Sequence, residues 1–450
     1  MSGERVPAVV LGVEHPRGVA VVRSLGRRGV PVVAVERDTE ARGLWSRYLS
    51  GTLLVSNDAE ETVTALESLG RERGGLLIPT TDPFLVLVSE HFDRLARFFS
   101  ITVPPWHVLE QLLDKPSCYR LAQQAGLATP RFYEPKDAAE LDRLVSTLDF
   151  EAHRYILSIK TPRGTAADLR TGRMTKVAGD NAESVRQGCL DIAARTGEFP
   201  MIAEVIPGRS DGCVGVTMVV DRSHRAVISY CVRRLQLFLY ALDSGFIHPY
   251  ELGANVYCES VRDDEAVEAA TRFVQAAGFY GAITVEFRRD TTSGRLVLIK
   301  ADPRVVRATS LSSALGLDVP TALYSVFTGE RHAVARIYPE RIAWIWLTWY
   351  LDTIWQNRTR VPLRVQLWAV LKNAHRLRAF AYLSLRDPLP GVVDAFRLTQ
   401  RVSVNATRAA LRAALPENTT LGKLARAAKR RFMLWRERAA AREDRAITRA

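Results

Sequence analysis

Several features that would place this chain in a specialised class of protein are absent or sparse. Its 450 residues include only 5 cysteines, scattered without a Cys-x-x-Cys pair, which argues against a zinc site and against a disulfide framework. The N-terminus lacks the basic, apolar and small-residue pattern of a secretory signal. We therefore expect a protein of the reducing cytoplasm.

Long apolar runs are also missing. The longest aromatic-rich apolar segment, Ile342 to Trp355, covers 14 residues and includes Asp352. A helix that spans a bilayer needs about 20 apolar residues. This segment predicts a buried helix, and the alternative is a helix that lies on a membrane surface.

Basic residues outnumber acidic residues in the whole sequence, but most of this excess lies near the C-terminus. The formal net charge is +13, and residues 405–450 supply +8 of it, with 12 Lys or Arg against 4 Asp or Glu. The other 404 residues thus carry +5, which does not indicate a nucleic-acid-binding protein. We expect a basic helical tail that packs on the protein surface. The alternative is a tail that contacts an anionic membrane or another polyanion.

The length and the apolar content, 47% of residues, suit two or three soluble domains. Residues 6–38 read as strand, turn, helix and strand, a βαβ unit that predicts a doubly wound parallel sheet. Gly12 and Gly18 lie in its turn without the Gly-x-Gly-x-x-Gly spacing, so a dinucleotide site is not indicated. Further on, Thr80-Thr81-Asp82 follows another strand. We expect Thr81 or Asp82 to cap the next helix, with substrate contact as the alternative.

A helix and a hairpin are predicted between residues 263 and 304. Residues 263–277 have helical spacing, and Gly278 stands where a helix C-cap is expected. Alternating apolar and polar residues then predict a strand over 283–288, and a turn leads to a returning strand.

Charged residues on this hairpin would meet across the sheet. Antiparallel pairing would set Glu286 against Lys300 and Asp302 on one surface. Two carboxylates there are a candidate Mg²⁺ site, because Mg²⁺ prefers oxygen ligands and shares them with substrate phosphates. The alternative is a solvent-facing hairpin with an ordinary ion pair.

Two stretches place lysine where phosphate groups could be bound. Asp114-Lys115 precedes a predicted helix, although pairing on the surface is the usual fate of such a lysine. Residues 154–180 predict two strands joined by a loop of arginine and glycine, with Lys160 at the end of the first strand. Positive charge beside backbone that can approach closely suits phosphate.

Two other predicted strands carry charged residues. Glu204 lies in an apolar strand and needs a partner there, because burial of an unpaired carboxylate is costly. Arg233 and Arg234 lie in the predicted strand over 226–240. Contact with a substrate anion and a structural ion pair explain these arginines equally well.

In their order, these segments resemble the ATP-grasp superfamily, and most closely its bacterial ATP-dependent carboxylate–amine ligases. The resemblance covers about residues 6–330, and Ser46-Arg47-Tyr48 and Asp387-Pro388-Leu389-Pro390 also resemble family elements. It implies an α/β protein in which a doubly wound parallel-sheet domain precedes two α+β subdomains that clasp ATP. The domains we expect are 1–110, the ATP-grasp domain 111–335 with a flap subdomain at about 130–205, a helical extension 336–404 and the basic tail 405–450.

The resemblance also implies a role for each motif residue. The residues implied to hold ATP are Lys115, Lys160, Glu204, Val205 and Ile206. Those implied to hold Mg²⁺ are Glu286 and Asp302, and those implied to meet substrate are Arg233 and Arg234. Arg304 would stabilise the charged transition state.

Lys300 departs from the family pattern. The second strand usually ends Glu-x-Asn-Pro-Arg, and here Lys300 stands at the position of that Glu, before Asp302-Pro303-Arg304. An ammonium group repels cations, so three outcomes follow: catalysis with one metal ion, Lys300 as a surrogate cation, or a fold that binds nucleotide poorly and does not turn over.

We expect a ligase that uses ATP and Mg²⁺ to join a small-molecule carboxylate to an amine through an acyl phosphate, with Arg304 and Lys300 as catalytic groups. The alternative is a degenerate ATP-grasp protein that acts as a binding module or docks on a membrane or polyanion. A homodimer and a peripheral location at the inner face of the membrane are compatible with this prediction.

Overall fold

The computed structural model describes residues 5–158, 177–179, 181–207, 212–239, 253–330, 337–356 and 362–400. The predictions for Lys160 and for the tail 405–450 lie outside these residues. The chain divides into two compact units, 1–392 and 393–450. In the second unit, the described residues 393–400 are helical, and the description below concerns the first.

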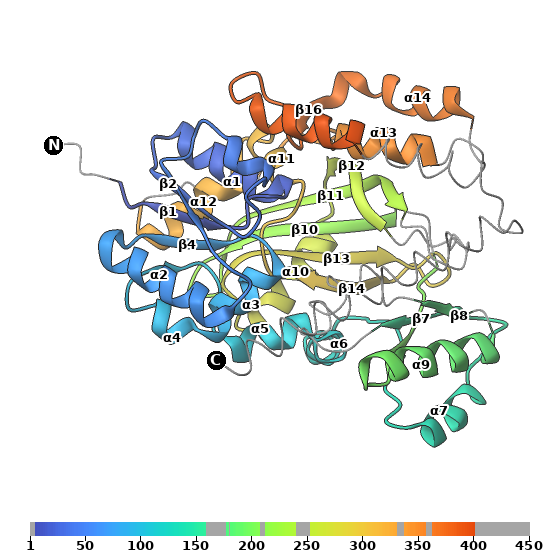
Figure 1. The fold of residues 1–450 in the computed structure, drawn as a ribbon. Coiled ribbons are helices and arrows are strands. Elements are labelled where there is room, and N and C mark those ends of the chain that lie inside the picture. The colour runs from blue at the N-terminus through green and yellow to red at the C-terminus, as the bar shows by residue number, and fades with distance from the viewer. Residues whose placement is uncertain are drawn as a thin grey trace, which may run out of the picture. The chain divides into compact units, whose positions relative to one another are not determined.

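The described N-terminal part contains a five-stranded parallel sheet with the order β3-β2-β1-β4-β5 (Figure 1). Its strands are β1 (Ala8–Leu11), β2 (Val32–Glu36), β3 (Gly51–Leu54), β4 (Leu76–Pro79) and β5 (Ser100–Ile101). The helices between them are α1 (Pro16–Arg27), the short η1 (Arg42–Trp45), α2 (Ala59–Arg73), α3 (Asp82–Glu90) and α4 (Phe92–Leu95). Strands β1, β2 and β4 are buried along their whole length, as expected for parallel strands covered on both faces. The predicted doubly wound sheet is confirmed.

The chain order reverses between β1 and β4. Strands β2 and β3 lie on one side of β1, whereas β4 and β5 lie on the other. In open α/β sheets, the crevice beyond the carboxyl ends of the strands at such a reversal is a common place for ligands. Helix α1 follows β1, and helix α3 follows β4, so both helices begin at this crevice.

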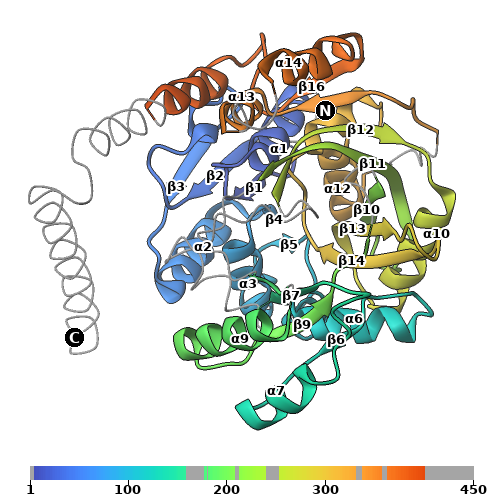
Figure 2. The same cartoon turned by 90° about the vertical axis from the view of Figure 1, so that its right-hand side faces the viewer.

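A small sheet comes next, with the order β6-β9-β7-β8. It consists of β6 (Phe132–Tyr133), β7 (Tyr155–Ser158), β8 (Val177–Gly179) and β9 (Met201–Glu204), with α7 (Ala138–Val145) and α9 (Ala182–Thr196) packed on it. Helices α5 (Trp106–Leu113) and α6 (Lys115–Gln124) connect the two sheets. Figure 2 shows the small sheet below the main body of the unit.

The largest described sheet has the order β14-β13-β10-β11-β12-β15-β16. Its strands are β10 (Cys213–Val220), β11 (Ala226–Leu239), β12 (Gly253–Val261), β13 (Gly281–Arg289), β14 (Leu296–Asp302), β15 (Ala343–Ile345) and β16 (Leu377–Phe380). The associated helices are α10 (Asp264–Ala276), α11 (Thr309–Ala314), α12 (Val319–Thr328), α13 (Leu347–Gln356), α14 (Leu363–Leu371) and the short η3 (Ala374–Arg376). One apolar core joins α1, α11 and α12 to strands of both larger sheets.

The helix and hairpin between residues 263 and 304 form as predicted. Asp263 is the N-cap of α10, and its carboxylate accepts a hydrogen bond from the Ala266 amide. Gly278 follows the helix with φ of 58°, a conformation that favours glycine. Strands β13 and β14 then pair in antiparallel register.

The predicted buried helix over 342–355 is only partly correct. Residues Ala343–Ile345 form strand β15, which pairs with β12, and helix α13 begins at Leu347. The backbone groups along β12 need partners, and the buried Trp344 anchors the strand that supplies them. Strand β16 adds to the same sheet, so the predicted helical extension contributes two strands that apolar periodicity did not reveal.

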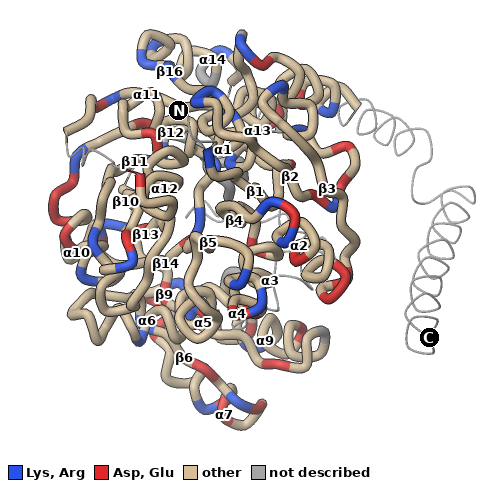
Figure 3. The backbone as a smooth tube through the Cα atoms, turned by 90° about the vertical axis from the view of Figure 1, so that its left-hand side faces the viewer, with Lys and Arg blue, Asp and Glu red and all other residues tan. Residues whose placement is uncertain are grey.

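Charged residues of both signs occur throughout the described part of the chain. Figure 3 shows acidic and basic residues interspersed along the elements on this side, including α2 and α10. Within the described residues, no helix is both long enough and apolar enough to cross a bilayer.

Candidate nucleotide and substrate site

A pocket of about 200 Å³ lies along the large sheet, beside the hairpin β13–β14. The described residues that line it include five basic and two acidic side chains. These are Arg17, Arg234, Lys300, Arg304, Arg307, Glu286 and Asp302. The excess of basic groups makes the pocket suited to anions.

The hairpin brings the predicted charged residues together. In the register of β13 and β14, Glu286 lies opposite Lys300, and Thr284 lies opposite Asp302. Residues two apart on a strand project from the same face, so Lys300 and Asp302 share one surface. The predicted pairing of Glu286 with Lys300 is confirmed.

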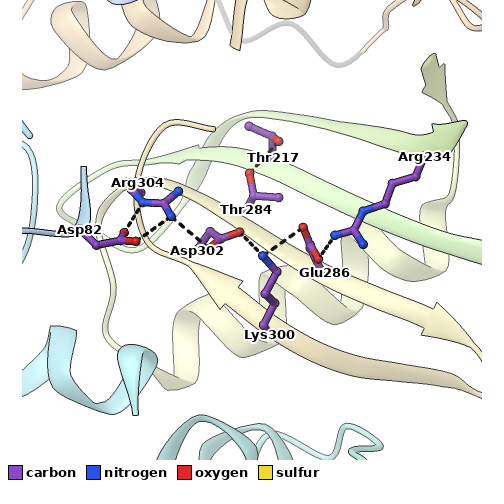
Figure 4. Close-up of polar contacts among 8 residues, drawn as sticks. All are labelled: Asp82, Thr217, Arg234, Thr284, Glu286, Lys300, Asp302 and Arg304. Carbon is purple, nitrogen blue, oxygen red and sulfur yellow. Dashed lines mark hydrogen bonds and ion pairs between the residues drawn. The ribbon is translucent and has the colours of Figure 1, made fainter. Parts of the chain in front are cut away.

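Lys300 lies between the two carboxylates. Its Nζ is 2.8 Å from Asp302 Oδ2 and 3.5 Å from Glu286 Oε1 (Figure 4). The other oxygen of Glu286 accepts a hydrogen bond from the Arg234 guanidinium. The other oxygen of Asp302 is 3.5 Å from Arg304 Nη2. Each carboxylate therefore faces two cationic side chains.

Electrostatics keep this cluster charged. Burial would raise the pKa of Asp302, but Lys300 and Arg304 outweigh it and hold that pKa well below its ordinary value. Burial also opposes ionisation of Glu286, and Arg234 with Lys300 lowers its pKa nevertheless. Burial alone would lower the pKa of the Lys300 ammonium, yet the two carboxylates raise it. The cluster is thus a set of ion pairs at neutral pH.

This arrangement does not fit a resident Mg²⁺ ion. A cation shared by Glu286 and Asp302 would have to lie where the Lys300 ammonium lies. Among the described residues, no group of three or more His, Cys, Asp or Glu side chains gathers to hold a metal. Lys300 contacts both carboxylates that were predicted to hold Mg²⁺, and its role as a surrogate cation stays a prediction.

Arg304 connects the hairpin to the N-terminal sheet. It donates two hydrogen bonds to Asp82, of which the Nη2 to Oδ2 contact measures 3.1 Å. Asp82 is the first residue of α3, and Thr81 occupies the N-cap position without a side-chain cap bond. Thr81 therefore holds the predicted N-cap position without a side-chain bond, and the predicted capping role is wrong for Asp82. The carboxylate of Asp82 is used by Arg304 instead.

The two candidate substrate arginines point to different partners. Because successive residues alternate between the faces of a strand, Arg234 lines the pocket, whereas Arg233 pairs with Glu259. Glu259 is almost fully buried and also lies 3.3 Å from Arg376. The structure thus places only Arg234 at the site.

The segment Glu204 to Ile206, which the resemblance implies holds ATP, lies at the end of β9. Glu204 finds the partner that its burial demands, since His153 Nδ1 lies 2.9 Å from its Oε1. The Val205 amide donates to the Arg154 carbonyl at 2.8 Å, and the Ile206 carbonyl accepts from Arg288 at 3.2 Å. Glu204, Val205 and Ile206 follow one another at the end of β9, and none of them lines the pocket beside Lys300.

Lys115 begins α6, which packs against β14. Asp114 caps this helix by accepting from the Ser117 amide, and Tyr119 donates to the Ile299 carbonyl at 3.0 Å. The Lys115 ammonium lies 5.8 Å from the centre of the Tyr119 ring. Helix α6 thus packs against the strand that carries Lys300, but Lys115 does not line the pocket, and its phosphate contact stays a prediction.

Sequence reasoning missed two residues of the pocket, Arg17 and Arg307. Arg17 is the second residue of α1, and Arg307 follows Arg304 by three positions. Neither arginine belongs to a sequence motif with a recognisable spacing of residues. Only the folded chain brings these two arginines, which are far apart in the sequence, into one pocket.

Comparisons with known proteins identify the fold. No model of a protein family matches the sequence, and no curated protein matches it either. Solved structures do match. N5-carboxyaminoimidazole ribonucleotide synthetase from Thermus thermophilus superposes with a TM-score of 0.56 at 15% identity, over 74% of this chain and 81% of that chain.

Two further enzymes show the same similarity. A β-γ-ATP complex of biotin carboxylase from Campylobacter jejuni gives a TM-score of 0.55 at 14% identity, over 74% of this chain and 73% of that chain. An L-amino acid ligase from Bacillus licheniformis gives 0.52 at 13% identity, over 72% and 74%. The protein therefore has the ATP-grasp fold that the order of its motifs predicted.

Proposed function

We propose that the protein is an ATP-dependent ligase that joins a small-molecule carboxylate to an amine, with the Lys300 ammonium in the place of a divalent cation. The observation that supports this is the position of Lys300 Nζ, 2.8 Å from Asp302 and 3.5 Å from Glu286. The ATP and ADP complexes among the similar structures support a nucleotide ligand.

Lys300 has the capacity to contact a phosphate while it keeps its carboxylate partners. An ammonium group has three N–H donors, and the contacts to Asp302 and Glu286 use at most two. The side chain is 38% exposed. One donor can therefore face a phosphoryl oxygen in the pocket.

The proposed reaction has two steps. A carboxylate oxygen of the substrate attacks the terminal phosphorus of ATP, the bond to the bridging oxygen breaks, and ADP leaves. The amine then attacks the acyl phosphate, and inorganic phosphate leaves as the amide forms and the amine loses a proton. Fixed cations act on the negative charge that develops on the transferred group, and Lys300 and Arg304 are the candidates for this role.

A labelling experiment tests the reaction. The full chain is incubated with ATP, amines and carboxylates that carry heavy oxygen, and the released phosphate is analysed by mass. An acyl-phosphate route moves one carboxylate oxygen into the phosphate. Unlabelled phosphate, or no ADP formation with any carboxylate and amine pair, contradicts the ligase.

A second candidate is a protein that binds nucleotide without turnover. The contacts that favour it are those of Glu286, since each of its two oxygens already faces a cationic side chain, Arg234 or Lys300. This candidate predicts ATP binding to the wild type with no phosphate release under any condition. Lys300→Glu would then gain Mg²⁺-dependent binding but no ligase activity.

A further inference from the structure

Each acidic side chain in and beside the pocket has a basic partner, and two arginines that line the pocket have no acidic partner of this kind among the described residues. Glu14 pairs with Arg42, Asp82 with Arg304, Asp302 with Lys300 and Glu286 with Arg234. Arg17 and Arg307 have no hydrogen bond or ion pair with a described residue, and the Nε of each is buried without a partner. Both line the pocket.

Arg17 is the more informative of the two because it is buried. Only 6% of the surface of Arg17 is exposed. A guanidinium stays protonated in proteins, so its charge is held in a place where water cannot solvate it well. Burial, with Arg304 nearby, lowers the pKa of Arg17, and Asp82 offsets this only in part. Among the described residues, no carboxylate forms an ion pair with this buried cation.

The surroundings of Arg17 add positive potential. Burial, Arg17 and Arg307 lower the pKa of His15 to about 3, so this N-cap residue is neutral at physiological pH. Arg17 lies in the first turn of α1, a 12-residue helix whose N-terminus carries partial positive charge. The acids nearby, Asp82 and Asp302, are already used by Arg304 and Lys300.

The place of Arg17 in the fold is also that of a ligand site. Helix α1 starts at the carboxyl end of β1, where the strand order reverses toward β4. The pocket extends from there to Lys300 on β14. An anion on Arg17 would thus share one pocket with a phosphoryl group on Lys300.

We propose that Arg17, assisted by Arg307, binds the carboxylate or phosphate group of an acceptor substrate. Guanidinium groups bind both oxyanions through paired N–H donors, so the shared chemistry is a small-molecule oxyanion. The proposal rests on the proposed function only in that it assigns this anion to the acceptor. The anion site itself depends on neither ATP nor turnover.

The test uses the full chain without nucleotide or added metal. Inorganic phosphate and succinate are titrated separately at constant ionic strength maintained with sodium chloride, and Kd and Tm are measured. At least one of them is expected to bind and to raise Tm, and the comparison of the two distinguishes a phosphate site from a carboxylate site. No binding of either overturns the proposal.

Three variants identify the group responsible. Arg17→Met is expected to weaken anion binding roughly tenfold to a hundredfold, the value of one charged hydrogen-bond pair. It should also raise Tm in the absence of anion, because an uncompensated buried charge is removed. Arg28→Met, on the exposed end of the same helix, should change neither quantity. Lys300→Gln should retain the Arg17-dependent binding.

The outcomes separate this proposal from the ligase. Anion binding that is equal in wild type and Arg17→Met, or an Arg17→Met protein that loses Tm, overturns the anion site. Displacement of the bound anion by ATP overturns its assignment to the acceptor. Arg17-dependent binding without label transfer in the ligase assay leaves the anion site standing and removes the ligase.

Discussion

The ammonium of Lys300 lies 2.8 Å from a carboxylate oxygen of Asp302, two positions further along the same strand. This ion pair follows from strand geometry, because residues two apart project from one face. The same ammonium lies 3.5 Å from Glu286, so it stands between the two carboxylates that the sequence predicted to hold Mg²⁺. One residue, Lys300, thus contacts both acidic side chains that line the pocket.

Removal of the ammonium should destabilise the protein moderately. In Lys300→Gln, Asp302 and Glu286 keep Arg304 and Arg234 but lose the cation between them. We expect a loss of about 1–2 kcal/mol in the free energy of unfolding, a value reduced by the partial exposure of Lys300. Urea unfolding measures it, with Lys136→Gln on an exposed lysine as the matched control. Equal values for the two variants would argue against the pair.

The contact of Arg304 with Asp82 should couple the hairpin to the N-terminal sheet. Asp82→Asn and Arg304→Gln, singly and together, form a double-mutant cycle. We expect a coupling free energy of about 1–2 kcal/mol, because the two hydrogen bonds involve charged groups but Asp82 is partly exposed. Additive effects of the two substitutions would show that the contact contributes nothing.

Asp387 should be among the most sensitive positions outside the pocket. This buried carboxylate accepts from Arg23 Nε and Ser46 Oγ, each at 2.8 Å, and from the Arg47 amide at 2.9 Å. Asp387→Ala would leave the buried Arg23 without its counterion, and we expect a loss of about 3–5 kcal/mol. The exposed neighbour Arg386→Ala is the control in the same urea experiment. A loss below 1 kcal/mol, roughly that of an ordinary surface change, is the contrary result.

The pH dependence of stability should report the paired carboxylates. The pKa values of Asp302 and Glu286 are lower in the folded protein than in the unfolded chain, so the unfolded chain binds more protons in acid. Their stabilisation is complete above about pH 5 and is lost as the pH falls further. We therefore expect acid unfolding of Asp302→Asn to be less steep than that of the wild type. Glu268→Gln, on the exposed face of α10, should follow the wild-type curve, and a wild-type slope in Asp302→Asn would contradict the lowered pKa.

The local features of the fold were predictable from the sequence. The helix before Gly278 and the register of Glu286 with Lys300 follow from periodicity and turn residues. The C-terminal strands were not predictable from the sequence, because residues Ala343–Ile345 become a strand only through pairing with β12. A three-residue strand within an aromatic run has no periodicity of its own.

Contacts between distant segments limited the prediction of the site. Ser46-Arg47 and Asp387 each resembled a family element, but no pattern showed that they bind one another across 341 residues. Asp82 was interpreted as a cap because helix starts usually use such residues that way. Its pairing with Arg304, and the unpaired state of Arg17 among the described residues, depend on the packing of segments that are far apart in the sequence.

The most direct test of the central claim is calorimetric titration of ATP into the full chain, in EDTA and in Mg²⁺, for the wild type and Lys300→Glu. We predict that the wild type binds ATP in EDTA, because Lys300 supplies a fixed cation, and that Lys300→Glu binds only with Mg²⁺. Lys300→Gln should bind more weakly than the wild type in EDTA, which keeps the test informative if Lys300→Glu does not fold. Wild-type binding that requires Mg²⁺, or no wild-type binding in either solution, would contradict the role given to Lys300.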